Sequence, residues 1–259
     1  MQNTLQITRH KKRINRKKQL RQRIFIVLTL LVLIFLFFTK VTGFAASITA
    51  QRLRANDYPE SLVSLMERNP EAKQFVMDYS KNIDKHETID LSGEITQGEI
   101  PLFLQWDERW GYEIYGNDFL AVTGCGPTCL SMIKCGLTGD TQWNPYQVAS
   151  FSDQSGYYVP GAGSSWDLME NGATSLGLQV HNIALSAEEI TSALQSGMPI
   201  ICSMRPGDFT TSGHFIVLAG LDEKGKIIVR DPNSRKNSKK SWNIDTLIPQ
   251  IKGLWAYSC

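Results

Sequence analysis

The spacing of apolar and polar residues changes along the chain, and the change falls near residue 198. Before it, apolar residues recur at helical spacing, and the predicted helices cover 125–136, 145–150, 166–176 and 187–196. After it, short β-branched or aromatic runs bounded by turns predict strands, which cover 198–204, 213–219, 226–230 and 254–257. One more short strand is predicted at 101–106. Helices followed by strands predict an α+β domain, in which one helix packs on an antiparallel sheet.

An apolar run near the N-terminus predicts a membrane segment. Residues 24–38 contain a single polar residue, Thr29, and as a helix they would span about 22 Å, less than the ~30 Å core of a bilayer. If the Lys40 side chain reaches the interface, the segment extends over 24–46, which is long enough to cross. We interpret 24–46 as an uncleaved transmembrane helix. The alternative is a signal peptide that is cleaved near the end of this segment.

Charge is distributed unevenly along the chain. Nine of the 27 Lys and Arg residues lie in the tail 1–23, which contains no Asp or Glu. This basic tail predicts a cytoplasmic N-terminus and a single pass, with everything after the membrane segment outside the cytoplasm. Beyond residue 46, 17 basic residues face 25 acidic ones, and this negative balance argues against nucleic acid as a partner.

Residues 47–99 predict a helical stalk or linker between the membrane segment and a main domain at 100–259. Apolar residues within 58–66 and 72–79 recur at helical spacing, and Pro70 separates them into two short helices. The alternative is a pro-segment that lies in an active-site groove.

Export changes the interpretation of the cysteines. The chain has five, an odd number that leaves at least one unpaired in an exported protein. Cys129, Cys135 and Cys202 are interpreted as small buried hydrophobic residues. No two cysteines are spaced as Cys-x-x-Cys, so neither a metal site nor another cofactor is predicted.

Cys125 differs from the other cysteines because of its neighbours. Gly124 and Gly126 allow a close approach of the backbone to other groups, and Pro127 suits the first turn of the helix that starts here. A thiolate at this place would be stabilised by the positive end of the helix dipole and by free backbone N–H groups, which favours a reactive cysteine. The simpler alternative is a buried cysteine on a core helix.

A thiol nucleophile needs a base, and the base needs a group that holds its ring. His214 begins one predicted strand and Asp231 ends the next. If these strands pair across a turn centred near residue 222, the two residues lie equally far from the turn and should face each other. Gln105 on the upstream strand is the candidate for an oxyanion donor, together with the backbone N–H of Cys125.

These residues, taken as an ordered set, resemble a known family. The matching stretches are Gln105-x-Asp107-x-x-Trp110, Gly124-Cys125-Gly126-Pro127-Thr128, Gly213-His214-Phe215-Ile216-Val217 and Asp231-Pro232-Asn233. They are similar to the C39-like branch of papain-like cysteine peptidases over roughly residues 100–258. The resemblance implies a papain-like α+β fold in which Cys125 is the nucleophile and His214 the base. It also implies that Asp231 orients the base and that Gln105 donates to the oxyanion.

We therefore expect an extracytoplasmic thiol hydrolase that cleaves a peptide or amide bond of a peptide or protein substrate through an acyl-enzyme. An alternative with the same catalytic residues acts on cell-wall peptide crosslinks or transfers the acyl group to an amine. A non-enzymatic alternative is a surface module that binds peptide in the same cleft through Trp106, Trp110 and Trp166.

Overall fold

The computed structural model of the protein describes residues 24, 25, 27–34, 37, 47–85 and 88–259. The chain divides into two units, residues 1–56 and residues 57–259. In the first unit, the described residues before 38 are helical, and so are residues 47–55. The basic tail 1–23 and the larger part of 35–46, which belongs to the predicted membrane segment, lie outside the described residues. Within the described part of the chain, no helix is both long and apolar enough to cross a bilayer.

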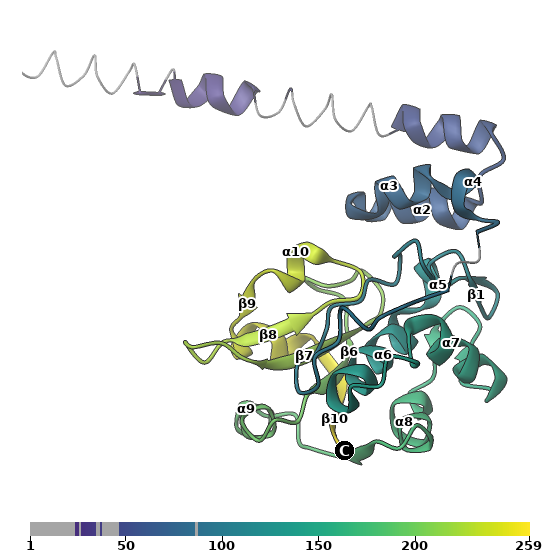
Figure 1. Ribbon diagram of the computed structural model, residues 1–259. Coiled ribbons are helices and arrows are strands. Elements are labelled where there is room, and N and C mark those ends of the chain that lie inside the picture. The colour runs from purple at the N-terminus through teal and green to yellow at the C-terminus, as the bar shows by residue number, and fades with distance from the viewer. Residues whose placement is uncertain (1–23, 26, 35–36, 38–46, 86–87) are drawn as a thin grey trace, which may run out of the picture. The chain divides into compact units, whose positions relative to one another are not determined.

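The second unit is built around an antiparallel sheet. In the described part of this unit, the main sheet has six strands in the order β5-β10-β6-β7-β8-β9. Figure 1 labels the strands β6 to β10 of this sheet. The strands are β5 (Gln179–His181), β6 (Ile200–Met204), β7 (His214–Leu221), β8 (Ile227–Arg230), β9 (Ser241–Trp242) and β10 (Ile251–Ser258). All neighbouring strands in it pair antiparallel. The last strand of the chain, β10, therefore lies inside the sheet, between β5 and β6.

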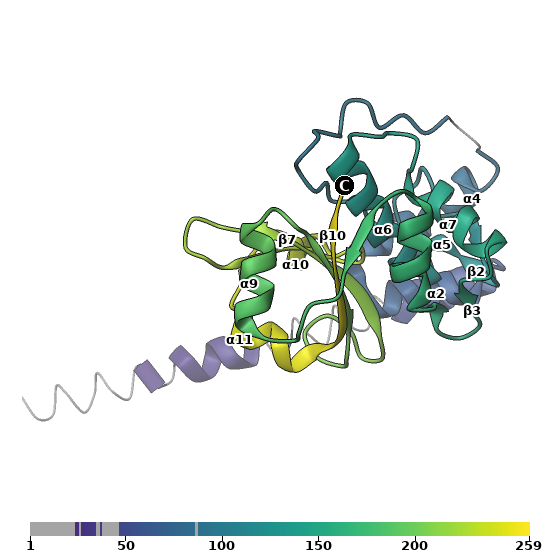
Figure 2. The ribbon, with the colours of Figure 1, turned by 90° about the horizontal axis from the view of Figure 1, so that it is seen from below.

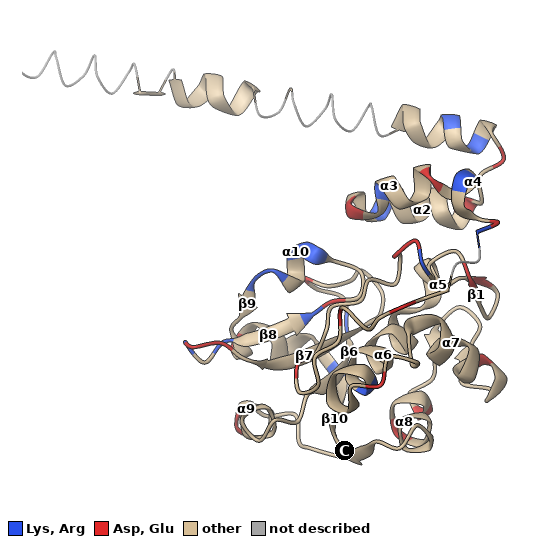
Figure 3. Ribbon diagram, viewed as in Figure 1, with Lys and Arg blue, Asp and Glu red and all other residues tan. Residues whose placement is uncertain are grey.

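Helices cover both faces of this sheet. Because side chains alternate along a strand, Phe215 and Val217 of β7 pack in the same cluster as α6 (Cys125–Thr138). Ile216 and Leu218 pack in the cluster that contains α9 (Ala187–Gln195). Figure 2 shows α6 and α9 on either side of β7 and β10. The helix α6 and the strands β6 and β7 together carry one Lys and no Arg, Asp or Glu (Figure 3), so the middle of this domain is almost free of formal charge.

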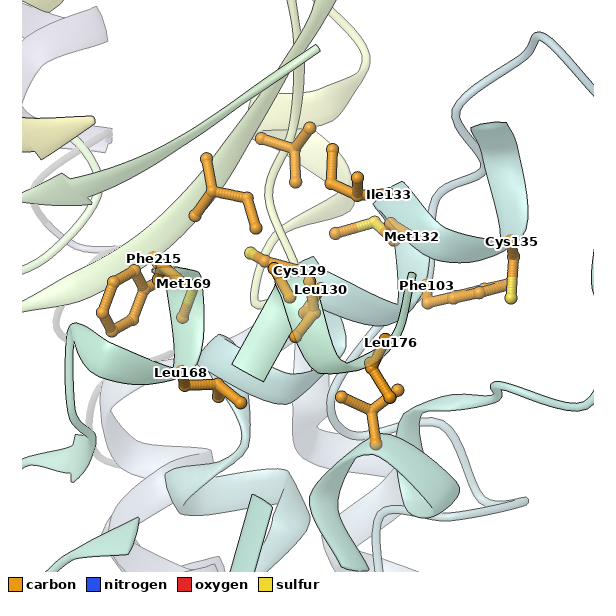
Figure 4. Close-up of a cluster of buried hydrophobic side chains, with 14 of the residues drawn as sticks. Phe103, Cys129, Leu130, Met132, Ile133, Cys135, Leu168, Met169, Leu176 and Phe215 are labelled. Atoms are coloured by element: carbon orange, nitrogen blue, oxygen red, sulfur yellow. The ribbon is translucent and has the colours of Figure 1, made fainter. Parts of the chain in front are cut away.

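The larger hydrophobic core lies between α6 and the sheet. Figure 4 shows Cys129, Leu130 and Met132 of α6 in one cluster with Phe215 and Met169. Full burial of a Leu, Met or Phe side chain stabilises the fold by about 1.5–3 kcal/mol. The residues that follow Cys125 in the helix therefore fix the position of its first turn.

The remaining elements of the described second unit are short. They are α2 (Glu60–Arg68), η1 (Pro70–Ala72), α3 (Lys73–Met77), α4 (Tyr79–Asn82), β1 (Ile114–Tyr115), β2 (Asp118–Phe119), α5 (Leu120–Thr123), α7 (Pro145–Gln154), β3 (Tyr158–Val159), β4 (Gly163–Ser164), the π-helix η2 (Leu168–Gly172), α8 (Ala173–Ser175), α10 (Arg235–Ser238), α11 (Ile244–Leu247) and η3 (Ile248–Gln250).

The structure confirms the α+β class and the main predicted elements. Helices α6, α7 and α9 and strands β6, β7, β8 and β10 lie where the pattern predicts them. The Asn144 side chain accepts a hydrogen bond from the backbone N–H of Gln147 at the start of α7, and Ser186 does the same for Glu189 at the start of α9. The short helices α2 and α3 are separated at Pro70, as predicted.

Some elements differ from the prediction. Residues 101–106 form no strand, and the backbone N–H of Gln105 donates instead to the carbonyl oxygen of Pro232 at 2.8 Å. The predicted helix 166–176 begins as the π-helix η2 and ends as α8. The pattern does not predict β5 and β9, because strands of two or three residues are too short for alternation to show.

Residues 57–99 belong to the same compact unit as the sheet. Nδ2 of Asn69 donates to the carbonyl oxygen of Asn233 at 2.7 Å and to its Oδ1 at 2.8 Å. The Glu71 carboxylate accepts a hydrogen bond from Ser234 Oγ at 2.5 Å. The segment between α2 and α3 is therefore bonded to the loop that follows β8.

Candidate active site

Cys125 is the first residue of α6, and close contacts hold the backbone on both sides of it. A Cβ at Gly124 would lie 2.4 Å from the carbonyl oxygen of Leu120, and one at Gly126 would lie 2.4 Å from Ser164 Oγ. Both positions therefore require glycine, which places Cys125 tightly between α5 and β4. The thiol is partly exposed and stands at the helix end where backbone N–H groups lack partners within the helix.

The other cysteines have different surroundings. Cys129, Cys135 and Cys202 are fully buried, as predicted. Burial raises the pKa of each of these thiols, in the case of Cys135 to about 12. Cys259 is exposed at the C-terminus, and all five cysteines, which the structure describes, are free thiols. Burial thus keeps three of the thiols protonated and out of reach of a substrate.

His214 and Asp231 form a buried pair. His214 begins β7, Asp231 directly follows β8, and His214 Nε2 lies 2.7 Å from Asp231 Oδ1. The two side chains are only 6% and 1% exposed. The pairing of β7 with β8 therefore brings together the two residues that the sequence suggests as base and orienting acid.

The register of this hairpin differs from the predicted one. Val217 pairs with Arg230, so Asp231 follows one step beyond that pair and lies diagonal to His214 rather than opposite it. The turn lies later in the sequence than predicted, since the N–H of Asp222 donates to the carbonyl oxygen of Lys226. This later turn shifts the register of the two strands, and a bulge in β7 corrects only part of the shift. The prediction of directly facing residues is wrong, but diagonal neighbours are still within reach of long side chains.

The Asp231 carboxylate is held by further hydrogen bonds. Its Oδ1 also accepts the backbone N–H of Asn233 at 2.9 Å, and its Oδ2 accepts Nδ2 of Asn237 at 2.8 Å. The backbone N–H of Asp231 donates to Ser238 Oγ at 2.8 Å. With both oxygens bonded, the carboxylate has one orientation toward the His214 ring.

The environment of His214 favours its protonated form. Burial lowers the pKa of the imidazole, but the charge of Asp231, the hydrogen bond with it and the interaction with Cys125 outweigh burial and raise the pKa to about 10. Because Nε2 faces Asp231, Nδ1 is the ring nitrogen left to exchange a proton with the Cys125 thiol. The pair can thus hold a positive charge beside a cysteine.

Gln105 lies between the two halves of the site. Its Nε2 donates to the carbonyl oxygen of Ala121 in α5 at 2.7 Å, and its backbone N–H donates to Pro232, next to Asp231. Its Oε1 is buried without a hydrogen-bond partner. The side-chain amide of Gln105 therefore lies near the start of α6. Its role as an oxyanion donor stays a prediction.

Cys125 and His214 line one cleft of about 760 Å³. The other lining residues come from the β3–β4 hairpin, from the end of β6, from the loop between β6 and β7, from the start of β7, and from Trp166 and Lys252. Among the described residues of 47–99, none lines the cleft, so the structure does not place this segment in the groove.

Of the three tryptophans in the binding-module alternative, only Trp166 lines the cleft. Trp106 and Trp110 are buried, and their indole N–H groups donate to backbone carbonyl oxygens. They belong to the core, so the sequence interpretation of these two as binding residues is wrong.

The sequence pattern misses several residues that shape the site. Asn237, which bonds to Asp231, carries no motif, and neither do Arg205 and Lys252, which line the cleft. Arg205 directly follows a predicted strand, and that position is the one signal that could have pointed to it. Within the described residues, no group of three or more His, Cys, Asp or Glu could hold a metal ion.

Comparison with known proteins agrees with this geometry. No curated protein matches the sequence. The family model described as Peptidase_C39 like family matches residues 97–258, which include Cys125, His214, Asp231 and Gln105. The match covers more than half of the chain and the whole of the sheet with the cleft, and the protein therefore belongs to the C39-like peptidase family.

Proposed function

We propose that the protein is a cysteine peptidase in which Cys125 and the His214–Asp231 pair cleave a peptide or amide bond. One observation carries this proposal: a partly exposed thiol and a buried, hydrogen-bonded imidazole line the same cleft. Membership of the C39-like peptidase family supports the same reaction class.

The proposed reaction begins with proton transfer from Cys125 to His214. The thiolate then attacks the carbonyl carbon of the substrate, and Asp231 stabilises the imidazolium through Nε2. The imidazolium gives its proton to the leaving amine, which departs and leaves an acyl-enzyme on Cys125. Water attacks this thioester, His214 accepts the proton of the water, and the acid product leaves as the thiol is restored.

Two donors are proposed for the oxyanion of the tetrahedral intermediate. The backbone N–H of Cys125 lies in the first turn of α6. The second proposed donor is the Gln105 amide, whose Nε2 donates to the carbonyl oxygens of Ala121 and Val122 and would have to release one of them to bind the oxyanion. A carbonyl oxygen between these groups would be stabilised as its negative charge develops.

The location outside the cytoplasm is also a proposal. It depends on the apolar segment 24–46 and on the basic tail 1–23 before it. Protease added to intact cells should degrade the domain 100–259 and spare the tail. A domain protected in intact cells and degraded only after lysis would contradict this orientation, and a mature protein that lacks 24–46 would support signal cleavage.

Labelling with a thiol-reactive electrophile tests the proposed nucleophile. Because Cys259 is also an exposed thiol, every variant carries Cys259→Ala. In that background Cys125→Ala should abolish both labelling and hydrolysis of a peptide mixture, whereas Cys129→Ala is the matched control, since that thiol is fully buried on the same helix. Equal labelling of the two variants would contradict the assignment. Release of stem-peptide fragments from purified cell wall would identify the crosslink-cleaving alternative.

A further inference from the structure

The cleft beside Cys125 carries positive charge in a domain that is otherwise acidic. Arg205 and Lys252 both line it, and among its described lining residues there is no Asp or Glu. Beyond residue 46 the chain has more acidic than basic residues, so two unopposed cations in one cleft depart from the overall balance. A low-dielectric cleft of one sign attracts groups of the opposite charge.

The fold places these two cations on neighbouring strands. Arg205 directly follows β6, and its backbone N–H donates to the carbonyl oxygen of Gln250 just before β10 at 2.7 Å. In β10, Ile251 pairs with Met204 and Gly253 pairs with Ser203. Lys252 is thus the extra residue of a β-bulge.

A bulge removes one residue from the normal alternation of a strand and turns its side chain in a new direction. Lys252 is exposed and lines the cleft rather than either core cluster. Met204, the last residue of β6, pairs with His214 on the other side. Two adjacent strands therefore present Arg205 and Lys252 beside the catalytic histidine.

Trp166 gives this side of the cleft a rigid apolar wall. Its ring packs on Gly253, where an added Cβ would come within 3.0 Å of the indole, and it lies edge-on to Trp255 with centroids 5.3 Å apart. The ring is 42% exposed. The Lys252 ammonium lies 5.4 Å from the centre of the Trp166 ring, which is within the range of a cation–π interaction.

Asp208, which is close to Arg205 in the sequence, and Glu170, which is not, both have other partners. Asp208 accepts a hydrogen bond from Gln250 Nε2 at 2.8 Å, and Glu170 accepts one from Trp255 Nε1 at 2.8 Å. Neither Arg205 nor Lys252 makes an ion pair with any residue that the structure describes. Their charges are available to a ligand.

We propose that the cleft contains an anion-binding subsite, which selects peptides that carry a carboxylate next to the bond to be cleaved. The carboxylate would lie between Arg205 and Lys252, with the adjacent part of the peptide against the face of Trp166. This inference rests on the proposed peptidase function. The carboxylate belongs either to an Asp or Glu side chain or to the end of a short peptide.

Two randomised libraries of short peptides test the subsite on the full-length protein. One library is acetylated and amidated at its ends, the other has a free terminal carboxylate, and mass spectrometry identifies the cleavage products. We expect products enriched in Asp or Glu at one fixed position from the cut. Cleavage confined to the second library, at one fixed distance from the free terminal carboxylate, would instead identify the chain end as the source of the carboxylate.

A double variant, Arg205→Gln with Lys252→Gln, should remove the preference. The ratio of kcat/KM for a Glu peptide to that for the matching Gln peptide should fall about tenfold, since two exposed ion pairs are lost. The readout is this ratio, because any loss that the two changes cause for both peptides alike cancels in it. Lys224→Gln with Lys226→Gln is the control, because it removes two exposed cations at the opposite end of β7.

An unchanged acid preference in the cleft double variant would overturn the subsite, and so would the absence of any preference in the wild type. Failure of the wild type to cleave either library would instead contradict the peptidase function. In that case the subsite is tested by the rate at which Cys125 reacts with peptidyl electrophiles that differ only in Glu or Gln. Equal rates would overturn it.

Discussion

The two sides of His214 are built in opposite ways. On one side, Asp231 is buried and both of its carboxylate oxygens are bonded to the protein. On the other side, Arg205 and Lys252 are exposed and have no ion-pair partner among the described residues. We call these the closed side and the open side of the site.

The difference shows which interactions are completed by folding and which are left for a ligand. A hydrogen bond formed on the closed side fixes the imidazole before a substrate arrives, so that no reorganisation is needed during the reaction. A cation without an ion-pair partner on the open side can form an ion pair with the substrate, and this ion pair contributes to substrate selectivity.

Changes on the closed side should have the largest effects. We expect His214→Ala to lower kcat/KM on a cleaved peptide by about 100- to 10,000-fold, the range for loss of a general base. His181→Ala is the control, because that imidazole bonds to Ser258 at the far edge of the sheet. Similar losses in both variants would show that the sheet, and not the base, had been damaged.

Asp231→Asn keeps the size of the side chain and removes its charge. We expect kcat/KM to fall by on the order of 100-fold, because the imidazolium loses its stabilising partner. The rate of Cys125 labelling, measured against pH, reports the pKa of His214. This pKa should be lower in the variant than the value of about 10 in the wild type. A profile that does not move would contradict the role of Asp231 in setting the charge of the pair.

The same pair makes folding stability depend on pH. His214 has a pKa near 10 in the folded protein and 6.5 as the ordinary value, so its stabilising contribution is complete below pH 6.5 and is lost as the pH rises through 10. We expect the melting temperature to fall over this interval. In Asp231→Asn the fall should be smaller, and an equal fall in both proteins would contradict this assignment.

The segment between α2 and α3 extends the closed side outward and should have a smaller effect. Asn69→Ala removes two hydrogen bonds to Asn233, whose backbone N–H bonds to Asp231. We expect a loss of about 1 kcal/mol in the free energy of unfolding, measured by denaturant titration, and a several-fold loss of activity. Asn82→Ala, which loses exposed bonds to Glu108 and Lys85 far from Asp231 in the sequence, should change neither.

Single changes on the open side should have the smallest effects. Lys252→Gln alone should lower kcat/KM for a Glu peptide by about two- to fivefold, and added salt should reduce the difference because exposed charges are screened. A loss as large as that of Asp231→Asn would show that the two sides do not differ in the way proposed here.

Part of this site could be predicted because its signals are local. Gly124 and Gly126 indicate that other groups approach the backbone closely, and Pro127 indicates the start of a helix. The position of Cys125 at a helix start could therefore be predicted from adjacent residues. The His214–Asp231 contact could be predicted from one short hairpin. Its register could not, because the place of the turn and the bulge depend on how both strands pack.

Other features failed as predictions because they depend on distant partners. Residues 101–106 have the composition of a strand, yet the N–H of Gln105 bonds to Pro232, more than a hundred positions away. Trp106 and Trp110 look like binding residues until the core encloses them.

The sequence by itself predicted the α+β class, the helix that begins at Cys125 and the candidate pair His214 and Asp231, since spacing and turn residues act over a few positions. Only the tertiary structure decided the diagonal contact of His214 with Asp231, the support from Asn237 and the cations of the open side. The physical reason is the order of the sheet. β10 comes last in the chain but enters next to β6, and a bulge there turns Lys252 toward the cleft that Cys125, more than a hundred positions earlier, also lines.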